Sequence, residues 1–506
     1  MPELDFSIDL HCHPQYKPFG RAHTDSSKPP APQSTSASAR SSLWYYDPPS
    51  LGDKLLNYFL SVTKFSQTNL TASLYGRHMV LTVGLGATEQ AFFKNKLGTG
   101  LIADLIDDFA AGFGRPRINA IQGLTDYWTD FQNEMKFMRE GENNPVRIDG
   151  EWYVYKMPAN FSELQQCIAS NEEKDAGTKK RPVIICLICA VEGLHILNCG
   201  LEKPCKPAEV KKNAAELKKM ANRPWFATFS HHFYNELCGH ARSLRKEIGK
   251  LTDQEKGINS GFTDLGLEVV DILLDNTNNN RILIDIKHMS PLARKKYFEL
   301  LAGKYKNESI PIIISHGVCN GLPDMNATAS RYPELGNTFI NPLDDVKGGD
   351  GKFKDHNVIN FYDDEILAMV RSGGIIGIQL DERRLANEET IKRVKHSLFR
   401  NKIMHYRSEL VWRQIQYIAE LLDDNNLYAW GNIAIGSDYD GLVDPLNAFW
   451  TTEEYDNLSS YLERHAYNYF KDNPTRLKNP INRISADLVV QKIFRDNAWN
   501  FFKTWY

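Results

Sequence analysis

Short apolar or alternating runs recur along the chain and predict eight β-strands. Between them lie segments whose apolar residues are near helical spacing, such as 267–277, 291–304 and 407–424. An alternation of strand and helix is typical of βαβ units, which build parallel sheets. The predicted strands span residues 6–12, 78–84, 182–191, 225–230, 281–287, 311–315, 373–380 and 432–437.

Eight such strands favour an α/β fold of the (β/α)8 TIM-barrel type, with long loop insertions and a helical C-terminal segment. The continuous apolar runs at 182–191 and 310–315 fit strands that are covered on both faces, as in a closed parallel barrel. An open doubly wound sheet is the alternative, because periodicity does not distinguish a closed sheet from an open one. We expect one barrel domain over residues 1–506.

Two stretches depart from this alternation. Residues 16–49 are rich in Pro, Ser, Ala and Lys and have almost no aliphatic residues before Leu43, which predicts a low-complexity insertion. Residues 317–355 follow the sixth predicted strand and predict an extended active-site loop, since loops at that end of a barrel strand shape the site.

Composition narrows the class of protein. The chain has 506 residues, of which 42% are hydrophobic and 24% charged, as in a globular protein with a large core. Its 60 basic and 63 acidic residues give a net charge of −3, so we expect neither nucleic acid nor membrane as a partner. The N-terminal sequence lacks a signal-peptide pattern, no apolar run is long enough to span a membrane, and the eight cysteines are too few for a disulfide scaffold. These features predict a cytoplasmic protein.

Side chains of the kinds that bind metals follow six of the predicted strands. His11 and His13 close the first strand, and their spacing of two places both on one face. The carboxyl ends of barrel strands converge on one mouth, so residues distant in sequence become neighbours there. The other strand-end candidates are Glu192, His231, His232, His288, His316 and Asp438.

The mixture of imidazoles and carboxylates indicates which ion these residues suit. One histidine after a strand is usually a hydrogen-bonded structural residue, but the joint pattern at six strand ends favours a metal site. Histidine with carboxylate ligands suits Zn²⁺ or another first-row divalent ion, whereas Mg²⁺ and Ca²⁺ prefer oxygen ligands.

In these blocks the chain resembles the membrane (renal) dipeptidase family, peptidase family M19, of the amidohydrolase-type metal-dependent hydrolases. The Asp-x-x-His-x-Ser block that contains His288 and the GSDYDG block that contains Asp438 are the most specific, while the first His-x-His motif is weak by itself. The stretches that carry the resemblance are DLHCHP at 9–14, VEGLH at 191–195, FATFSHH at 226–232, GFTDLGLEVVDILL at 261–274, ILIDIKHMS at 282–290, IIISHG at 312–317 and IAIGSDYDG at 433–441.

The resemblance implies a binuclear zinc enzyme that cleaves the amide bond of a dipeptide or a similar small N-acyl amino acid. It implies that His11 and His13 hold one zinc, that His288 and His316 hold the other, and that Glu192 bridges the two. Asp438 would complete the metal site and act as the general acid and base for a metal-bridging hydroxide. His231 would bind the scissile carbonyl and stabilise the oxyanion, with His232 as its less favoured substitute.

The chain departs from the family pattern at two places. The family usually has His-x-Asp at the first strand, whereas this chain has His13 in the second position, which makes the first metal site less anionic. The family also places an arginine after the sixth-strand histidine to clamp the substrate carboxylate. Here that region is expanded, Arg331 is the nearest candidate clamp, and His356 is the next candidate for substrate binding.

Several alternatives remain open from the sequence. The same two metals would also serve a lactonase, esterase or phosphoesterase, and the barrel would also serve a catalytically silent binding protein. For Lys287, Ser315 and the Cys186–Cys189 pair we favour structural roles over a carbamylated metal ligand, a serine nucleophile and a zinc knuckle respectively. A homodimer is a further expectation from the resemblance alone.

Overall fold

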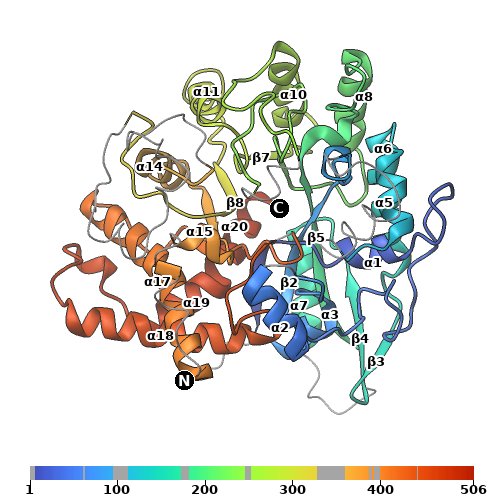
Figure 1. The fold of residues 1–506 in the computed structure, drawn as a ribbon. Coiled ribbons are helices and arrows are strands. Elements are labelled where there is room, and N and C mark those ends of the chain that lie inside the picture. Colours follow the sequence, from blue (N-terminus) through green and yellow to red (C-terminus); the bar gives the residue numbers. More distant parts are fainter. Residues whose placement is uncertain are drawn as a thin grey trace.

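Eight parallel strands form the barrel that the sequence pattern predicts (Figure 1). The computed structural model describes residues 6–60, 63–94, 112–172, 182–244, 252–326, 359–386, 390–391, 399–441 and 443–506. In barrel order the strands are β1 (Ser7–Cys12), β2 (His78–Leu85), β5 (Val183–Glu192), β6 (Phe226–Thr228), β7 (Leu283–Asp285), β8 (Ile313–Gly317), β9 (Ile375–Ile378) and β10 (Ile433–Ile435).

The first and last strands meet where their carboxyl ends leave the barrel. Cys12 forms a parallel bridge with Tyr439, and the amide of His13 donates to the Tyr439 carbonyl at 2.9 Å. The amide of Asp438 donates in turn to the His11 carbonyl at 2.9 Å. The nearly closed barrel is therefore confirmed over an open sheet, and two candidate metal-binding segments lie side by side at its seam.

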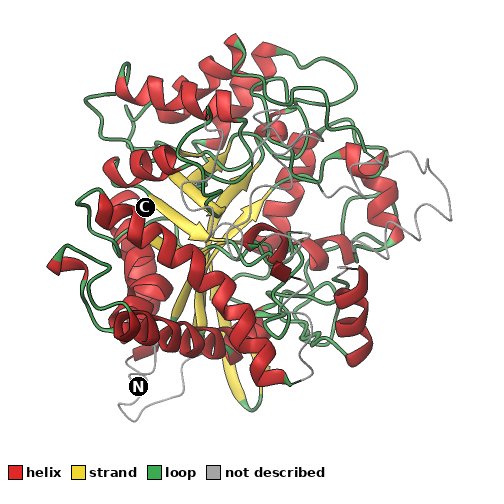
Figure 2. Cartoon of the chain, turned by 60° about the vertical axis from the view of Figure 1, so that its left-hand side comes forward, coloured by secondary structure: helices red, strands yellow, loops and turns green. Residues whose placement is uncertain are grey.

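The barrel strands are buried on both faces. Every residue of β1 is buried, and β5 is buried from Ile184 to Glu192. Side chains that point inward fill the barrel, and those that point outward pack under the helices, which is why these strands are continuously apolar. Figure 2 shows the strands in yellow, surrounded by red helices.

The predicted helical segments are helices in the structure, and the ends that differ are shifted by two to seven residues. Thr263 accepts a hydrogen bond from the amide of Gly266, so α10 begins three residues before the apolar pattern does. The α-helices among the described residues are α1 (Tyr16–Arg21), α2 (Leu51–Leu60), α3 (Leu70–Tyr75), α5 (Arg115–Gln122), α6 (Tyr127–Glu140), α7 (Phe161–Glu172), α8 (Pro207–Leu217), α10 (Asp264–Leu274), α11 (Pro291–Ala302), α14 (Asp363–Arg371), α15 (Glu382–Leu385), α17 (Arg400–Asp424), α18 (Tyr455–Asp472), α19 (Ala486–Gln491) and α20 (Asn497–Trp505).

The C-terminal segment is helical, as predicted, and packs against the amino ends of the strands. Asn497 at the start of α20 donates to the carbonyls of Trp430 and Ile433 at 2.8 and 2.7 Å. The ring of Trp225, just before β6, lies 5.1 Å from that of Phe502. This helix covers the amino end of the barrel, so the strand-end residues face the opposite, carboxyl end.

A short hairpin that the sequence analysis did not predict extends the sheet beyond the barrel. It consists of β3 (Val146–Ile148) and β4 (Glu151–Lys156), and β4 pairs in parallel with the start of β5. Only two residues of β4 are fully buried, Val154 and Tyr155, so the apolar alternation that marks a strand is weak there.

The predicted insertion at 16–49 begins with α1 and then runs without strands or further helices, and it buries Leu43 and Trp44 in the main core. Of the predicted loop at 317–355, residues 327–355 lie outside the described residues. Among the helices that the structure describes, none combines the length and the apolar character needed to cross a membrane.

Candidate metal centre

Glu192, the last residue of β5, lies at the centre of the strand-end cluster. Its Oε1 is 3.2 Å from His11 Nε2, and its Oε2 is 3.2 Å from His13 Nε2. The Nε2 atoms of His288 and His316 lie 3.5 and 3.6 Å from Oε1. The structure thus brings together histidines from three strand ends around one carboxylate, which itself ends a fourth strand.

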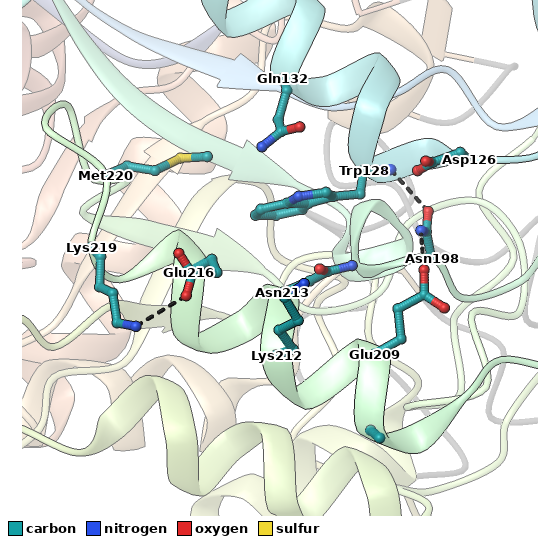
Figure 3. Close-up of a pocket in the computed structure, with 11 residues that line it drawn as sticks. Asp126, Trp128, Gln132, Asn198, Glu209, Lys212, Asn213, Glu216, Lys219 and Met220 are labelled. Carbon is teal, nitrogen blue, oxygen red and sulfur yellow. Dashed lines mark hydrogen bonds and ion pairs between the residues drawn. The ribbon is translucent and has the colours of Figure 1, made fainter.

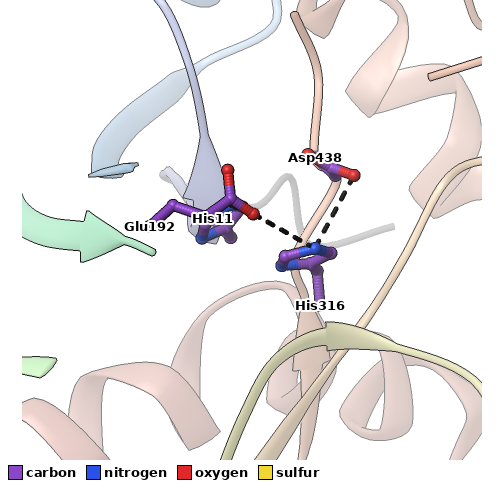
Figure 4. A group of neighbouring side chains, drawn as sticks. All are labelled: His11, Glu192, His316 and Asp438. Carbon is purple, nitrogen blue, oxygen red and sulfur yellow. Dashed lines mark ion pairs between the residues drawn. The ribbon is translucent and has the colours of Figure 1, made fainter. Parts of the chain in front are cut away.

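Asp438 closes the cluster on the side of β10 (Figure 4). Its Oδ1 is 3.5 Å from His13 Nε2, and its Oδ2 is 3.7 Å from His316 Nε2. Asp438 and His288 have φ values of +60° and +65°, in the left-handed region that non-glycine residues rarely occupy. Such strained backbone is concentrated at functional sites, where it aims a side chain at the end of a strand.

Hydrogen bonds behind two of the histidines orient their rings. His13 Nδ1 lies 2.8 Å from the Gly84 carbonyl, which can only accept, so Nδ1 carries a proton. The Ser315 hydroxyl donates to Asp285 at 2.6 Å, and His316 Nδ1 in turn lies 2.9 Å from that hydroxyl oxygen. In both rings Nε2 is the nitrogen that faces Glu192, as in metal-bound histidines whose other nitrogen donates to an oxygen.

The ring nitrogens around Glu192 lack ordinary partners among the described residues. Both nitrogens of His11 and of His288, and Nε2 of His13 and of His316, are buried without a hydrogen bond. Buried polar atoms are nearly always paired, and an unpaired one is costly. The fit of these residues to a divalent cation is therefore good, and imidazoles with carboxylates suit Zn²⁺ or a similar first-row ion.

The pKa shifts favour an anionic Glu192, whereas the pKa values of the imidazoles around it shift in different directions. Burial raises the pKa of Glu192, but the charges of His231, His11 and His13 outweigh burial and hold it well below its usual range. Burial lowers the pKa of His288 to about 3. His13 differs, because Glu192 and Asp438 overcome burial and raise its pKa well above the usual value, so cation binding there displaces a proton.

The ligand atoms fall into two sets around the shared Glu192. His11, Glu192, His316 and Asp438 have atoms within 4.8 Å of one another, and so do Glu192, His231 and His288. This grouping differs from the predicted pairing of His288 with His316, whose ring centroids are 5.4 Å apart. The assignment of each side chain to one ion remains a prediction.

His231, rather than His232, faces Glu192. Its Nε2 lies 3.5 Å from Glu192 Oε2, whereas His232 Nδ1 lies 2.6 Å from the hydroxyl of Ser243. On its other side His231 Nδ1 is 2.8 Å from Oε2 of Glu89. Glu89 was missed by the sequence analysis, because it lies four residues beyond β2 and not at the end of that strand.

Two further residues that the sequence analysis did not assign to the site support Asp438. Gln379, just after β9, donates from Nε2 to Asp438 Oδ2 at 2.7 Å. Its Oε1 accepts from Nζ of Lys287 at 3.2 Å. Lys287 is fully buried, and burial together with Arg384 lowers its pKa to about 7. Lys287 thus holds the amide of Gln379, which in turn orients Asp438.

The remaining candidates lie in different surroundings. Arg331 and His356 lie outside the described residues, so their predicted role in substrate binding stays a prediction. Cys186 and Cys189 are buried in β5 and contribute to the core. The Ser315 hydroxyl is fully buried and engaged with Asp285.

A hollow lies away from this cluster, on the outside of the barrel between α6 and α8 (Figure 3). It encloses about 740 Å³ and contains no metal-centre residue in its lining. Four of its polar side chains bond to one another in pairs, Lys219 with Glu216 and Asn198 with Glu209. We assign it no chemical role.

Neither a family model nor a curated protein matches the chain. Solved structures that resemble it include dipeptidase AC, a metallopeptidase of family M19, at 12% identity and a TM-score of 0.45 over 87% of this chain and 90% of that one. A metallopeptidase from Rhodobacter sphaeroides, bound to a phosphinate mimic of the dipeptide L-Ala-D-Ala, matches at 11% identity and a TM-score of 0.44, over 87% and 91%. The probable dipeptidase PvdM from Pseudomonas aeruginosa matches at 12% and 0.43, over 86% and 88%. The family that the sequence motifs resemble is thus represented among these structures.

Proposed function

We propose that the chain is a metal-dependent hydrolase of the dipeptidase type, which cleaves the amide bond of a dipeptide or a similar small N-acyl amino acid. The observation that supports this most directly is the ring of buried imidazole nitrogens around Glu192 that have no hydrogen-bond partner in the described part of the chain. The catalytic site belongs at the carboxyl end of the barrel, as in other enzymes with this fold.

Two zinc ions are the proposed cofactors, bridged by Glu192. When bound, such a pair lowers the pKa of water so that hydroxide is available near neutral pH, and it polarises the scissile carbonyl. His11, His13, His288, His316 and Asp438 would hold the ions through the atoms that face Glu192. The Gly84 carbonyl fixes the ring orientation of His13, and the Ser315 hydroxyl fixes that of His316.

Asp438 is the proposed general acid and base. Gln379 occupies its Oδ2, so Oδ1 is the oxygen that remains to accept a proton from the attacking water and deliver it to the leaving amine. His231 is the proposed partner of the carbonyl oxygen, because its Nε2 faces the cluster and its side chain is 13% exposed, more than the other histidines there.

The test is hydrolysis of a panel of L,L- and L,D-dipeptides by the zinc-loaded protein, with and without chelator. Asp438→Asn serves as the catalytic variant, and Asp444→Asn, a buried aspartate outside the cluster, as its matched control. We expect cleavage that chelator abolishes, a rate at least about 100-fold lower in Asp438→Asn, and little change in the control.

Two outcomes would contradict the proposal in different ways. Faster turnover of lactones, esters or phosphoesters than of dipeptides would keep the metal centre and replace the substrate class. Tight zinc binding with no turnover of any of these substrates would favour a binding protein.

A further inference from the structure

Glu89 is a buried carboxylate that contacts three consecutive residues of the loop after β6. It precedes the short 3-10 helix at Gln90–Phe92 and is 4% exposed. Its Oε2 lies 2.8 Å from His231 Nδ1 and accepts from the amide of His232 at 3.3 Å. Its Oε1 accepts from the amide of Phe233 at 3.0 Å. The loop after β2 is thereby fixed to the segment that carries His231.

The opposite side of the His231 ring faces the metal centre, with Nε2 3.5 Å from Glu192 Oε2. A carboxylate acceptor at one ring nitrogen fixes both the orientation of an imidazole and the nitrogen that it presents on its other side. Glu89 therefore fixes the orientation in which His231 Nε2 faces a substrate at the cluster.

We propose that Glu89 is a positioning residue for His231: it holds Nδ1–H, directs Nε2 at the substrate carbonyl, and stabilises the imidazolium that faces the developing oxyanion. This inference rests on the proposed amide hydrolysis. Glu89 does not touch the substrate, and its effect passes through His231, as that of the buried aspartate passes through histidine in serine proteases.

A competing arrangement is a third metal ion between Glu89, His195 and His231, whose ligand atoms also lie within 4.8 Å of one another. His195 Nε2 lies 2.5 Å from the Ala87 carbonyl, and the buried Nδ1 atoms of His195 and His231 have no hydrogen-bond partner among the described residues. Two ligand atoms on one tetrahedral zinc are about 3.3 Å apart, given zinc–ligand distances of about 2.0–2.1 Å. The 2.8 Å between Glu89 Oε2 and His231 Nδ1 is shorter than this spacing and fits a direct ion pair.

The first experiment compares Glu89→Gln, His231→Asn and the double variant in the zinc-loaded protein. Glu236→Gln is the matched control, because Glu236 also accepts from two backbone amides, those of Gly200 and Cys205, but forms no hydrogen bond or ion pair with a histidine among the described residues. We expect Glu89→Gln to lower kcat about 10- to 100-fold with little change in KM, and the double variant to be no slower than His231→Asn. Losses that multiply in the double variant would overturn the proposal, because they would mean that Glu89 acts independently of His231.

A second experiment does not depend on turnover. In protein labelled with ¹⁵N-histidine, we expect the proton between His231 Nδ1 and Glu89 to give a far-downfield resonance that disappears in Glu89→Gln and persists in Glu236→Gln. Its absence in the wild type, or a zinc ion lost in His195→Ala, would overturn the proposal. If the wild type hydrolysed no amide, the proposed function would fail, while the resonance and the zinc content would still decide between the hydrogen bond and a third ion.

Discussion

Gln379 donates a hydrogen bond from Nε2 to Oδ2 of Asp438 at 2.7 Å, from a buried position at the carboxyl end of β9. The bond occupies one carboxylate oxygen and leaves Oδ1 directed at the cluster. Because Lys287 donates to the other end of the amide, the orientation of Gln379 is itself fixed. The proposed proton carrier is thus held by residues that do not belong to the metal-ligand set.

Replacing Gln379 with Leu should lower kcat about 10- to 100-fold, because Asp438 loses the donor that orients it. Zinc content should change less than the rate. Gln416→Leu is the matched control, since Gln416 is also buried and donates to a carboxylate, that of Glu420, outside the site. Equal losses in both variants would mean that Gln379 contributes only to stability.

Gly84 allows the first two histidines to approach β2. A Cβ at this position would lie 2.7 Å from Cε1 of His13 and 2.9 Å from Cε1 of His11. Gly84→Ala should therefore displace both rings and weaken zinc binding at least about tenfold, measured by competition with a chelator. At Gly261 a Cβ meets nothing within 4 Å, so Gly261→Ala should bind zinc like the wild type.

Arg294 and Glu365 form a buried bidentate ion pair between α11 and α14, at 2.6 and 3.0 Å. Arg294→Met leaves the Glu365 carboxylate buried without this partner and should lower the free energy of unfolding by about 3–5 kcal/mol. Arg242 pairs with Glu255 at the surface, so Arg242→Met should cost less than about 1 kcal/mol. Similar shifts in the urea midpoints of the two variants would contradict this account.

Burial raises the pKa of the Glu134 carboxyl to about 7. The protonated form is favoured in the folded state, so the stability that this group contributes is present at acidic pH and is lost as pH rises through about 7. Relative to Glu134→Gln, the wild type should lose about 3 kcal/mol of unfolding free energy between pH 4 and pH 8. A pH-independent difference between the two proteins would show that the carboxyl titrates normally.

The sequence predicted the eight barrel strands and the histidines and carboxylates at their ends. This was possible for two reasons. Barrel strands are buried on both faces, so their sequences are continuously apolar. In addition, the carboxyl ends of all the strands in a parallel barrel lie at the same mouth. His11, Glu192 and Asp438 are examples. Each lies at or just after the end of an apolar strand, and their ligand atoms lie within 4.8 Å of one another in the structure.

The residues that orient the ligands could not be predicted in the same way. Glu89 lies in a loop, and its contact with His231 depends on how two loops pack after the barrel forms. Gln379 is a neutral amide at the end of a predicted strand, which carries no metal-ligand signal by itself. Gly84 is one glycine in an apolar strand, and its importance arises from the two histidine rings at the end of the neighbouring strand β1.

The most direct test of the central claim is anomalous diffraction at the zinc edge from crystals of the zinc-loaded protein. The account predicts two ions, each about 2.0–2.2 Å from an oxygen of Glu192, with His11 and His288 on different ions. One ion, ions bound elsewhere, or no ion at this carboxylate would contradict it.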